Sequence, residues 1–192
     1  MFRQADGLKR PCLRATCLTA TPLPRPLPAA LVWLLLAVGH VALVWHHGAA
    51  LSARVATHFN LQGLANGWQT RGDFLLWASL GPVAIGLFVV AVIGLCLKFP
   101  RAWNLPHKAH WTAPEQLPQA RAFLLAWAFW LAVLLLLMTG LLLQGVLQVN
   151  LSAAPVRLPR LWTVLSVVIP TPLVGLMIGW LYLFFGRPAA RS

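Results

Sequence analysis

The stretch that decides the fold is residues 122–147, AFLLAWAFWLAVLLLLMTGLLLQGVL, which contains no ionisable side chain. An α-helix rises about 1.5 Å per residue, so about 20 apolar residues cross the roughly 30 Å hydrocarbon core of a bilayer. This stretch is long enough to do so. It therefore predicts a transmembrane helix.

Three more segments pass the same test, at residues 29–45, 74–97 and 161–185. Only His40 interrupts them with a side chain that is charged or titrates near neutral pH. We therefore expect an all-α integral membrane protein with four transmembrane helices. Pro82 and the pair Pro170 and Pro172 predict kinks in two of the helices. An alternative for the first segment is a signal peptide that is cleaved near Ala50 or Ala53.

Composition supports a membrane protein. Of the 192 residues, 59% are hydrophobic and 9% are charged, and the formal net charge is +12. Soluble domains carry about 25% charged residues, so this composition excludes a conventional soluble enzyme. It also excludes a disordered chain, which lacks apolar residues. Because the cations flank long apolar runs, the expected partner is the lipid bilayer and not nucleic acid.

The distribution of cations predicts the orientation. Most of the 15 Lys and Arg residues lie before the first segment, between the second and third, and after the fourth. The positive-inside bias then places both termini and the middle loop in the cytoplasm. We divide the chain into a flexible, basic, Pro-rich lead (1–28), a two-span segment with both loops (29–121) and a two-span segment with a short tail (122–192).

The outer loop, residues 46–73, is too apolar to be disordered. Leu51, Val55 and Phe59 follow the i, i+4, i+8 spacing of one helical face, which predicts a short helix on the membrane surface. Gly63 and the pair Asn66-Gly67 predict turns after that helix, because both residue types accept positive φ.

Both loops contain motifs with a family resemblance. Thr57-His58-Phe59-Asn60, followed by Gly63 and Asn66-Gly67-Trp68, resembles the THFN…G…DGW loop of SdpI-type bacterial membrane proteins. Residues 104–111, NLPHKAHW, with 113–115, APE, resemble that family's second signature, NLPNKxYWxAPE. The sequence departs from the family pattern at Asn66, His107 and His110, where Asp, Asn and Tyr are usual.

The resemblance implies a multi-pass protein of the bacterial inner membrane. The best-known members of that family provide immunity to a secreted peptide toxin, coupled to control of a repressor. We therefore expect the outer loop to bind an extracytoplasmic peptide, protein or lipid, and the middle loop to contact a cytoplasmic regulator. The candidate outer-loop residues are Thr57, His58, Phe59, Asn60, Gly63, Gly67 and Trp68. The candidate cytoplasmic residues are Asn104, Pro106, Lys108, Trp111, Pro114 and Glu115.

Enzymatic alternatives are less well supported. Asp6, Asp73 and Glu115 are the only carboxylate side chains, and the bilayer separates Asp73 from Glu115. A triad of Ser52, His58 and Asp73 lacks a nucleophile-elbow motif. We expect no cofactor, with one alternative: a metal-dependent enzyme that holds zinc or copper. The candidate metal ligands are His46, His47 and His58.

Two further interpretations remain open. A small transporter or channel subunit would use a cavity opened by the helix kinks. The polar residues that would line this cavity are Thr139, Gln144, Thr163 and Ser166. Gly175 and Gly179 form a small-xxx-small pair, which predicts a homo-oligomer formed through the fourth segment. The primary hypothesis remains a non-enzymatic membrane protein that recognises its partner with the outer loop.

Overall fold

The computed structural model describes residues 25–152 and 157–186. Four helices are long and apolar enough to cross a membrane: Pro26–Gly48 (α1), Arg71–Cys96 (α2), Leu117–Leu151 (α4) and Arg160–Phe185. The last contains α5 (Arg160–Thr163), a π-helical turn, η2 (Val164–Val168), and α6 (Pro170–Phe185). The prediction of four helices with the length and composition of membrane spans is confirmed. The predicted lead, residues 1–28, lies mostly outside the described residues.

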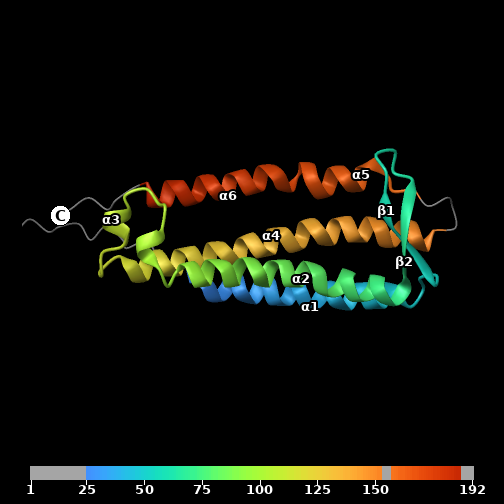
Figure 1. Ribbon diagram of the computed structural model, residues 1–192, viewed down its shortest axis with the longest axis horizontal. Coiled ribbons are helices and arrows are strands. Elements are labelled where there is room, and N and C mark those ends of the chain that lie inside the picture. The colour runs from blue at the N-terminus through green and yellow to red at the C-terminus, as the bar shows by residue number, and fades with distance from the viewer. Residues whose placement is uncertain (1–24, 153–156, 187–192) are drawn as a thin grey trace, which may run out of the picture.

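The four helices run side by side along the long axis of the molecule (Figure 1). A two-stranded β-hairpin lies at one end of this bundle. The short helices η1 (Pro100–Ala102) and α3 (Lys108–Trp111) lie at the other end. α1 begins and α6 ends at the α3 end, as expected for a chain with four antiparallel crossings.

The hairpin corrects two predictions. Residues expected to form a surface helix form strand β1 (Arg54–Phe59), which pairs antiparallel with β2 (Ala65–Thr70). The fold is therefore mostly helical, as expected, with one β-hairpin added. Val55 is fully buried in a core cluster with Val44 and Phe74, and Phe59 packs against the same cluster. Val55, Thr57 and Phe59 are buried or half-buried with the two-residue period of a strand, and Ala56 between them is buried as well, so the helical spacing does not hold.

The turn lies at Asn60–Leu64 and not at Asn66-Gly67. The side-chain Oδ1 of Asn60 accepts hydrogen bonds from the backbone N–H groups of Gln62 (3.0 Å) and Leu64 (2.9 Å). Gly63 has a φ of 80°, which favours glycine. Gly67 lies inside β2 opposite His58, and a Cβ there would lie 2.6 Å from His58 Cβ. Close strand approach therefore requires this glycine.

α4 is the central helix of the bundle. Its 35 residues span about 52 Å at 1.5 Å per residue, which exceeds the thickness of a bilayer core. The helix is therefore longer than a bilayer crossing requires, and its two ends contact the elements at both ends of the bundle. Aromatic side chains fill the core at the α3 end, and they are Trp103, Trp111, Phe123 and Phe185.

The prolines have different effects in the two helices where kinks were expected. α2 continues as an α-helix through Pro82. In the fourth span, the α-helix gives way to the π-helical turn η2 immediately before Pro170. Such a turn is a recognised way to accommodate a proline that cannot donate a backbone hydrogen bond.

Candidate functional site

The hairpin is fastened to α4 by the side chain of Asn150. Its Oδ1 accepts a hydrogen bond from the Ala56 N–H (2.8 Å), and its Nδ2 donates to the Ala56 carbonyl (2.9 Å). Nδ2 also donates to the Val146 carbonyl (2.8 Å). Ala56 is fully buried, so its backbone groups depend on this amide. Asn150 thus takes the place that a neighbouring strand would occupy along β1.

A second attachment joins the tip of the hairpin to the segment before α5. The Leu158 N–H donates to the Gly63 carbonyl (2.8 Å), and the Arg157 Nε donates to the Gln62 carbonyl (3.1 Å). Leu64 and Arg157 form an isolated antiparallel bridge. The hairpin is therefore held by α4 and by the segment before α5, and it lies across the end of the bundle (Figure 1).

The structure divides the seven candidate residues of the outer loop. Thr57 lines a cavity with α2 and α4, and Phe59 packs against the core. Asn60, Gly63 and Gly67 serve the turn and the strand pairing, as described above. His58 and Trp68 remain exposed, Trp68 by 45%. Only these two side chains of the seven are available to a partner and have no evident role in the fold.

The candidate metal ligands do not form a cluster. His46 and His47 lie at the end of α1 with their rings edge to face, 5.3 Å between centroids, while His58 lies on β1. Among the described residues, no group of three His, Cys, Asp or Glu side chains lies close enough to hold a metal ion.

The candidate triad is not assembled either. The Ser52 hydroxyl donates to the Arg54 carbonyl, and the Asp73 carboxylate accepts from the Thr70 hydroxyl (2.6 Å). Asp73 also uses its backbone N–H to bond Thr70 Oγ1 (3.2 Å), so this pair caps the start of α2. Both groups serve the local backbone instead of orienting His58.

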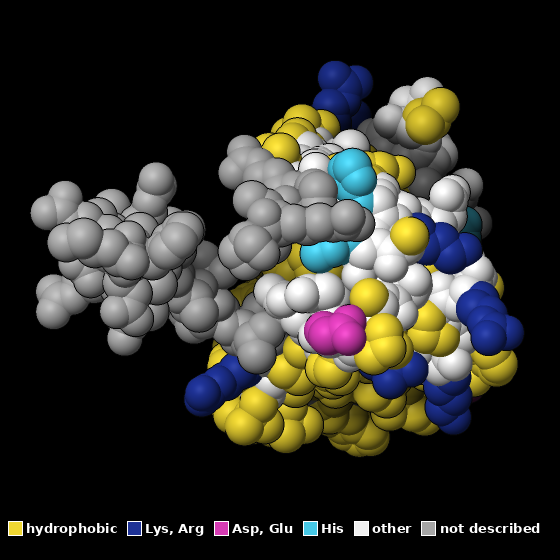
Figure 2. Space-filling view, turned by 90° about the vertical axis from the view of Figure 1, so that its left-hand side faces the viewer, with side chains coloured by type: hydrophobic (Ala, Val, Ile, Leu, Met, Phe, Trp, Pro, Cys, Tyr) yellow, Lys and Arg dark blue, Asp and Glu magenta, His cyan; other side chains and the backbone are white. Residues whose placement is uncertain are grey.

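At the opposite end of the bundle, Trp111 is a core residue. It is 4% exposed, and its Nε1 donates to the carbonyl of Phe185 at the end of α6 (2.9 Å). Lys108 donates to the Arg101 carbonyl, and Pro106 is half-buried. The exposed candidates at this end are Asn104, Lys108, Pro114 and Glu115. Figure 2, which looks onto this end, shows Lys and Arg side chains around its rim.

His40 joins α1 to α2 within the apolar part of the bundle. Its Nε2 lies 2.8 Å from the Ala78 carbonyl oxygen. In an α-helix this carbonyl would accept from the N–H of residue 82, but Pro82 has no N–H. Because a carbonyl only accepts, Nε2 must carry the proton. His40 therefore satisfies a backbone group that the proline leaves free, as membrane helices require.

A double-mutant cycle tests this link. We expect His40→Phe to lower the free energy of unfolding by about 1 kcal/mol, the scale of interhelical hydrogen bonds in membranes. In a Pro82→Ala background the cost should fall towards zero, because the N–H restored at residue 82 can bond the Ala78 carbonyl. Unfolding in mixed micelles measures both values, with the exposed His46→Phe as control. Equal costs of His40→Phe in both backgrounds would refute the link.

The polar residues expected to line a single transport path are placed apart. The Thr139 hydroxyl donates to the Leu135 carbonyl (2.8 Å), and the Ser166 hydroxyl donates to the Trp162 carbonyl (2.7 Å). Thr139 lines a cavity of about 310 Å³ beneath the hairpin, whereas Gln144 lines another of about 390 Å³ between α1 and α4. Thr163 is exposed on α5.

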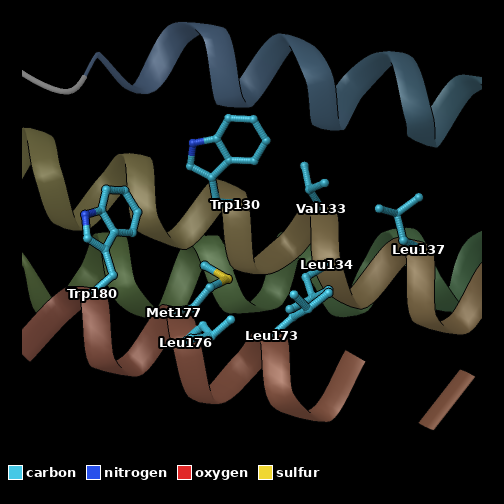
Figure 3. Close-up of a pocket in the computed structure, with 8 residues that line it drawn as sticks. All are labelled: Trp130, Val133, Leu134, Leu137, Leu173, Leu176, Met177 and Trp180. Carbon is cyan, nitrogen blue, oxygen red and sulfur yellow. The ribbon is translucent and has the colours of Figure 1, made fainter. Parts of the chain in front are cut away.

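A larger cavity, about 480 Å³, lies between α4 and α6 (Figure 3). Its lining is apolar apart from the indole nitrogens of Trp130 and Trp180. It therefore presents an apolar surface for packing and few groups that could bind a polar ligand or take part in a reaction. Gly175 and Gly179 lie on α6, and a Cβ at either would meet nothing within 4 Å. The oligomer predicted from these glycines thus remains a prediction.

Comparison with protein-family models, curated proteins and solved structures finds no match to this chain. The family resemblance thus rests on the two loop motifs. The hairpin contains the first motif, and α3 with its flanking residues contains the second.

Proposed function

We propose that this chain is a non-enzymatic, multi-pass protein of the bacterial inner membrane that recognises a peptide segment with its hairpin. The loop motifs support the bacterial inner membrane. The exposed cations at the α3 end favour a cytoplasmic position for that end, with the hairpin on the other side of the membrane. His107, where the family has Asn, has a φ of 51°, a conformation that Asn adopts more readily than most residues. This backbone conformation supports the resemblance.

The observation that carries the proposal is the outer edge of β2. Asn150 bonds both backbone groups of Ala56, so those groups point away from β2. Ala56 pairs with Trp68, and both members of such a non-hydrogen-bonded pair turn their N–H and C=O groups outward. Among the described residues, β2 pairs with no strand besides β1. The backbone of Trp68 therefore faces an edge to which an extended peptide can add.

The side chains of the hairpin suit the same partner. Trp68 is 45% exposed at this edge, and large aromatic side chains commonly anchor peptide and protein partners. Leu61, at the tip, is 96% exposed. The hairpin backbone is pinned at Ala56, Gln62 and Gly63, so a partner would meet a preformed surface and little ordering entropy would oppose binding.

The test places a photoreactive residue at Asn66 on β2 and a matched probe at Trp77, which is 66% exposed on α2. In intact cells, we expect peptide or protein adducts at residue 66 and lipid adducts at residue 77. Trp68→Pro removes the outward N–H, so it should abolish the adducts at residue 66, whereas Trp68→Phe should keep most of them. Hydrogen exchange at the Ala56 amide would verify that the hairpin stays folded. Lipid adducts alone at residue 66 would disprove the proposal.

The α3 end is proposed as the contact for a cytoplasmic regulator. Trp111 is buried there and Pro106 is half-buried. Asn104, Lys108, Pro114 and Glu115 are the candidates that are exposed to a partner. A photoreactive residue at Pro114 should therefore capture a cytoplasmic protein, and a probe that captures nothing but lipid would remove this part of the proposal.

A further inference from the structure

The cavity between α1 and α4 combines apolar walls with two polar side chains. It has a volume of about 390 Å³, and His40 and Gln144 are its polar lining residues. Gly39 on α1 and Gly140 on α4 create the space between the helices. A Cβ at Gly39 would meet nothing within 4 Å, and one at Gly140 would lie 3.6 Å from His40 Nδ1.

Both polar side chains offer a hydrogen-bond acceptor here. Nε2 of His40 donates to the Ala78 carbonyl, so in the neutral imidazole Nδ1 carries a lone pair and no proton. Nδ1 is the ring atom nearest Gly140, one of the lining residues. The Oε1 atom of Gln144 is buried and has no hydrogen-bond partner. Native interiors rarely leave such an acceptor unpaired, so a donor is expected.

The surroundings restrict what this donor can belong to. No Lys, Arg, Asp or Glu side chain lines the cavity, so a charged group would find no counter-charge. His40 lies eight residues before the end of α1, which places it about 12 Å below the hairpin end. The rim is formed by leucines that are exposed on the outside of the bundle, and they are Leu35, Leu43, Leu137 and Leu141. A ligand can therefore enter sideways from the bilayer.

We propose that this cavity binds a neutral, hydroxyl-bearing lipid, whose hydroxyl donates to His40 Nδ1 or Gln144 Oε1 and whose chain lies along the leucines. A hydroxyl supplies the missing donor without a charge, and an alkyl chain matches the apolar walls. This site lies inside the bundle and shares no residue with the β2 edge. It is therefore independent of the peptide recognition proposed above.

The test compares two photoreactive probes that differ only in the donor: a diazirine-labelled long-chain alcohol and its methyl ether. Each is incorporated into phosphatidylcholine vesicles that contain the full chain, and adducts are located by mass spectrometry. We expect the alcohol to label α1 and α4 at this cavity about fivefold more than the ether, the scale of one net hydrogen bond. Equal labelling would show that the hydroxyl donor makes no hydrogen bond in the cavity and would overturn the proposal.

Variants identify the site without disturbing the His40 link to α2. Gln144→Leu removes the unpaired acceptor at similar size, and it should remove most of the preference for the alcohol. Gly39→Leu fills the cavity and should abolish labelling by both probes. Gly94→Leu is the matched control, because a Cβ at Gly94 also meets nothing within 4 Å but this residue does not line the cavity. A preference that survives both Gln144→Leu and Gly39→Leu would place the alcohol elsewhere.

Discussion

Trp111→Ala is expected to lower the free energy of unfolding by about 3–5 kcal/mol, the range for truncating a buried aromatic side chain. Trp111 stacks on Phe184 and meets Phe185 edge to face, each with ring centroids 5.2 Å apart. Its indole N–H bonds the last carbonyl of α6, which has no helical donor of its own. The variant therefore loses both packing and a helix cap.

Two controls separate these contributions. Trp77→Ala removes an indole that is 66% exposed on α2, and it should cost less than about 1 kcal/mol. Trp111→Phe keeps an aromatic ring but loses the N–H, so its cost should fall between those of the two alanine variants. Unfolding in mixed micelles gives the free energies, and hydrogen exchange at the end of α6 reports its release. A cost of Trp111→Ala no greater than that of Trp77→Ala would contradict the packing described.

Asn150→Leu should release the hairpin from the bundle. The substitution is close in size, but it leaves the N–H and C=O of the fully buried Ala56 without partners. Each unpaired buried group costs about 1–3 kcal/mol, so we expect a loss of roughly 2–5 kcal/mol or local unfolding of β1 and β2. Faster hydrogen exchange at the hairpin amides, with α1 and α2 unchanged, is the expected signature.

Gln148→Leu is the matched control for this prediction, because it makes a similar change on the exposed side of α4. It should leave hairpin exchange unaltered. The same exchange rates in both variants would mean that the hairpin does not depend on the Asn150 amide. Loss of peptide adducts at residue 66 in Asn150→Leu would be the functional counterpart, because the β2 edge would lose its support.

The sequence alone was sufficient to predict the four long helices, because a long apolar run that crosses a membrane has few alternatives to a helix. It was misleading for the hairpin. Leu51, Val55 and Phe59 fit a helical spacing, while Val55, Thr57 and Phe59 fit a strand equally well. The structure decides between them through Asn150, a residue 94 positions from Ala56. The local spacing of apolar residues contains no information about a hydrogen-bond partner that is 94 positions away in the sequence.

The loop motifs selected candidate residues of two kinds. His58 and Trp68 were selected from their motif and are exposed, whereas Asn60 and Trp111 came from the same motifs and serve the fold. The bond from His40 could have been anticipated, because a proline inside a helix always frees the carbonyl four residues before it. The cavity acceptor on Gln144 depends on which way its side chain turns, and no sequence rule gives that direction.

The long-range contacts at both ends of the bundle have a consequence for biosynthesis. The hydrogen bond from Trp111 can form only after Phe185, 74 residues further along, has been synthesised. The bond to the Gln62 carbonyl at the tip of the hairpin likewise requires Arg157, 95 residues later. A ribosome adds about 5–20 residues per second, so each partial structure persists for several seconds. During that interval the nascent chain exposes an unpaired hairpin on one side and an open aromatic cluster on the other. Completion of the last helix therefore closes both.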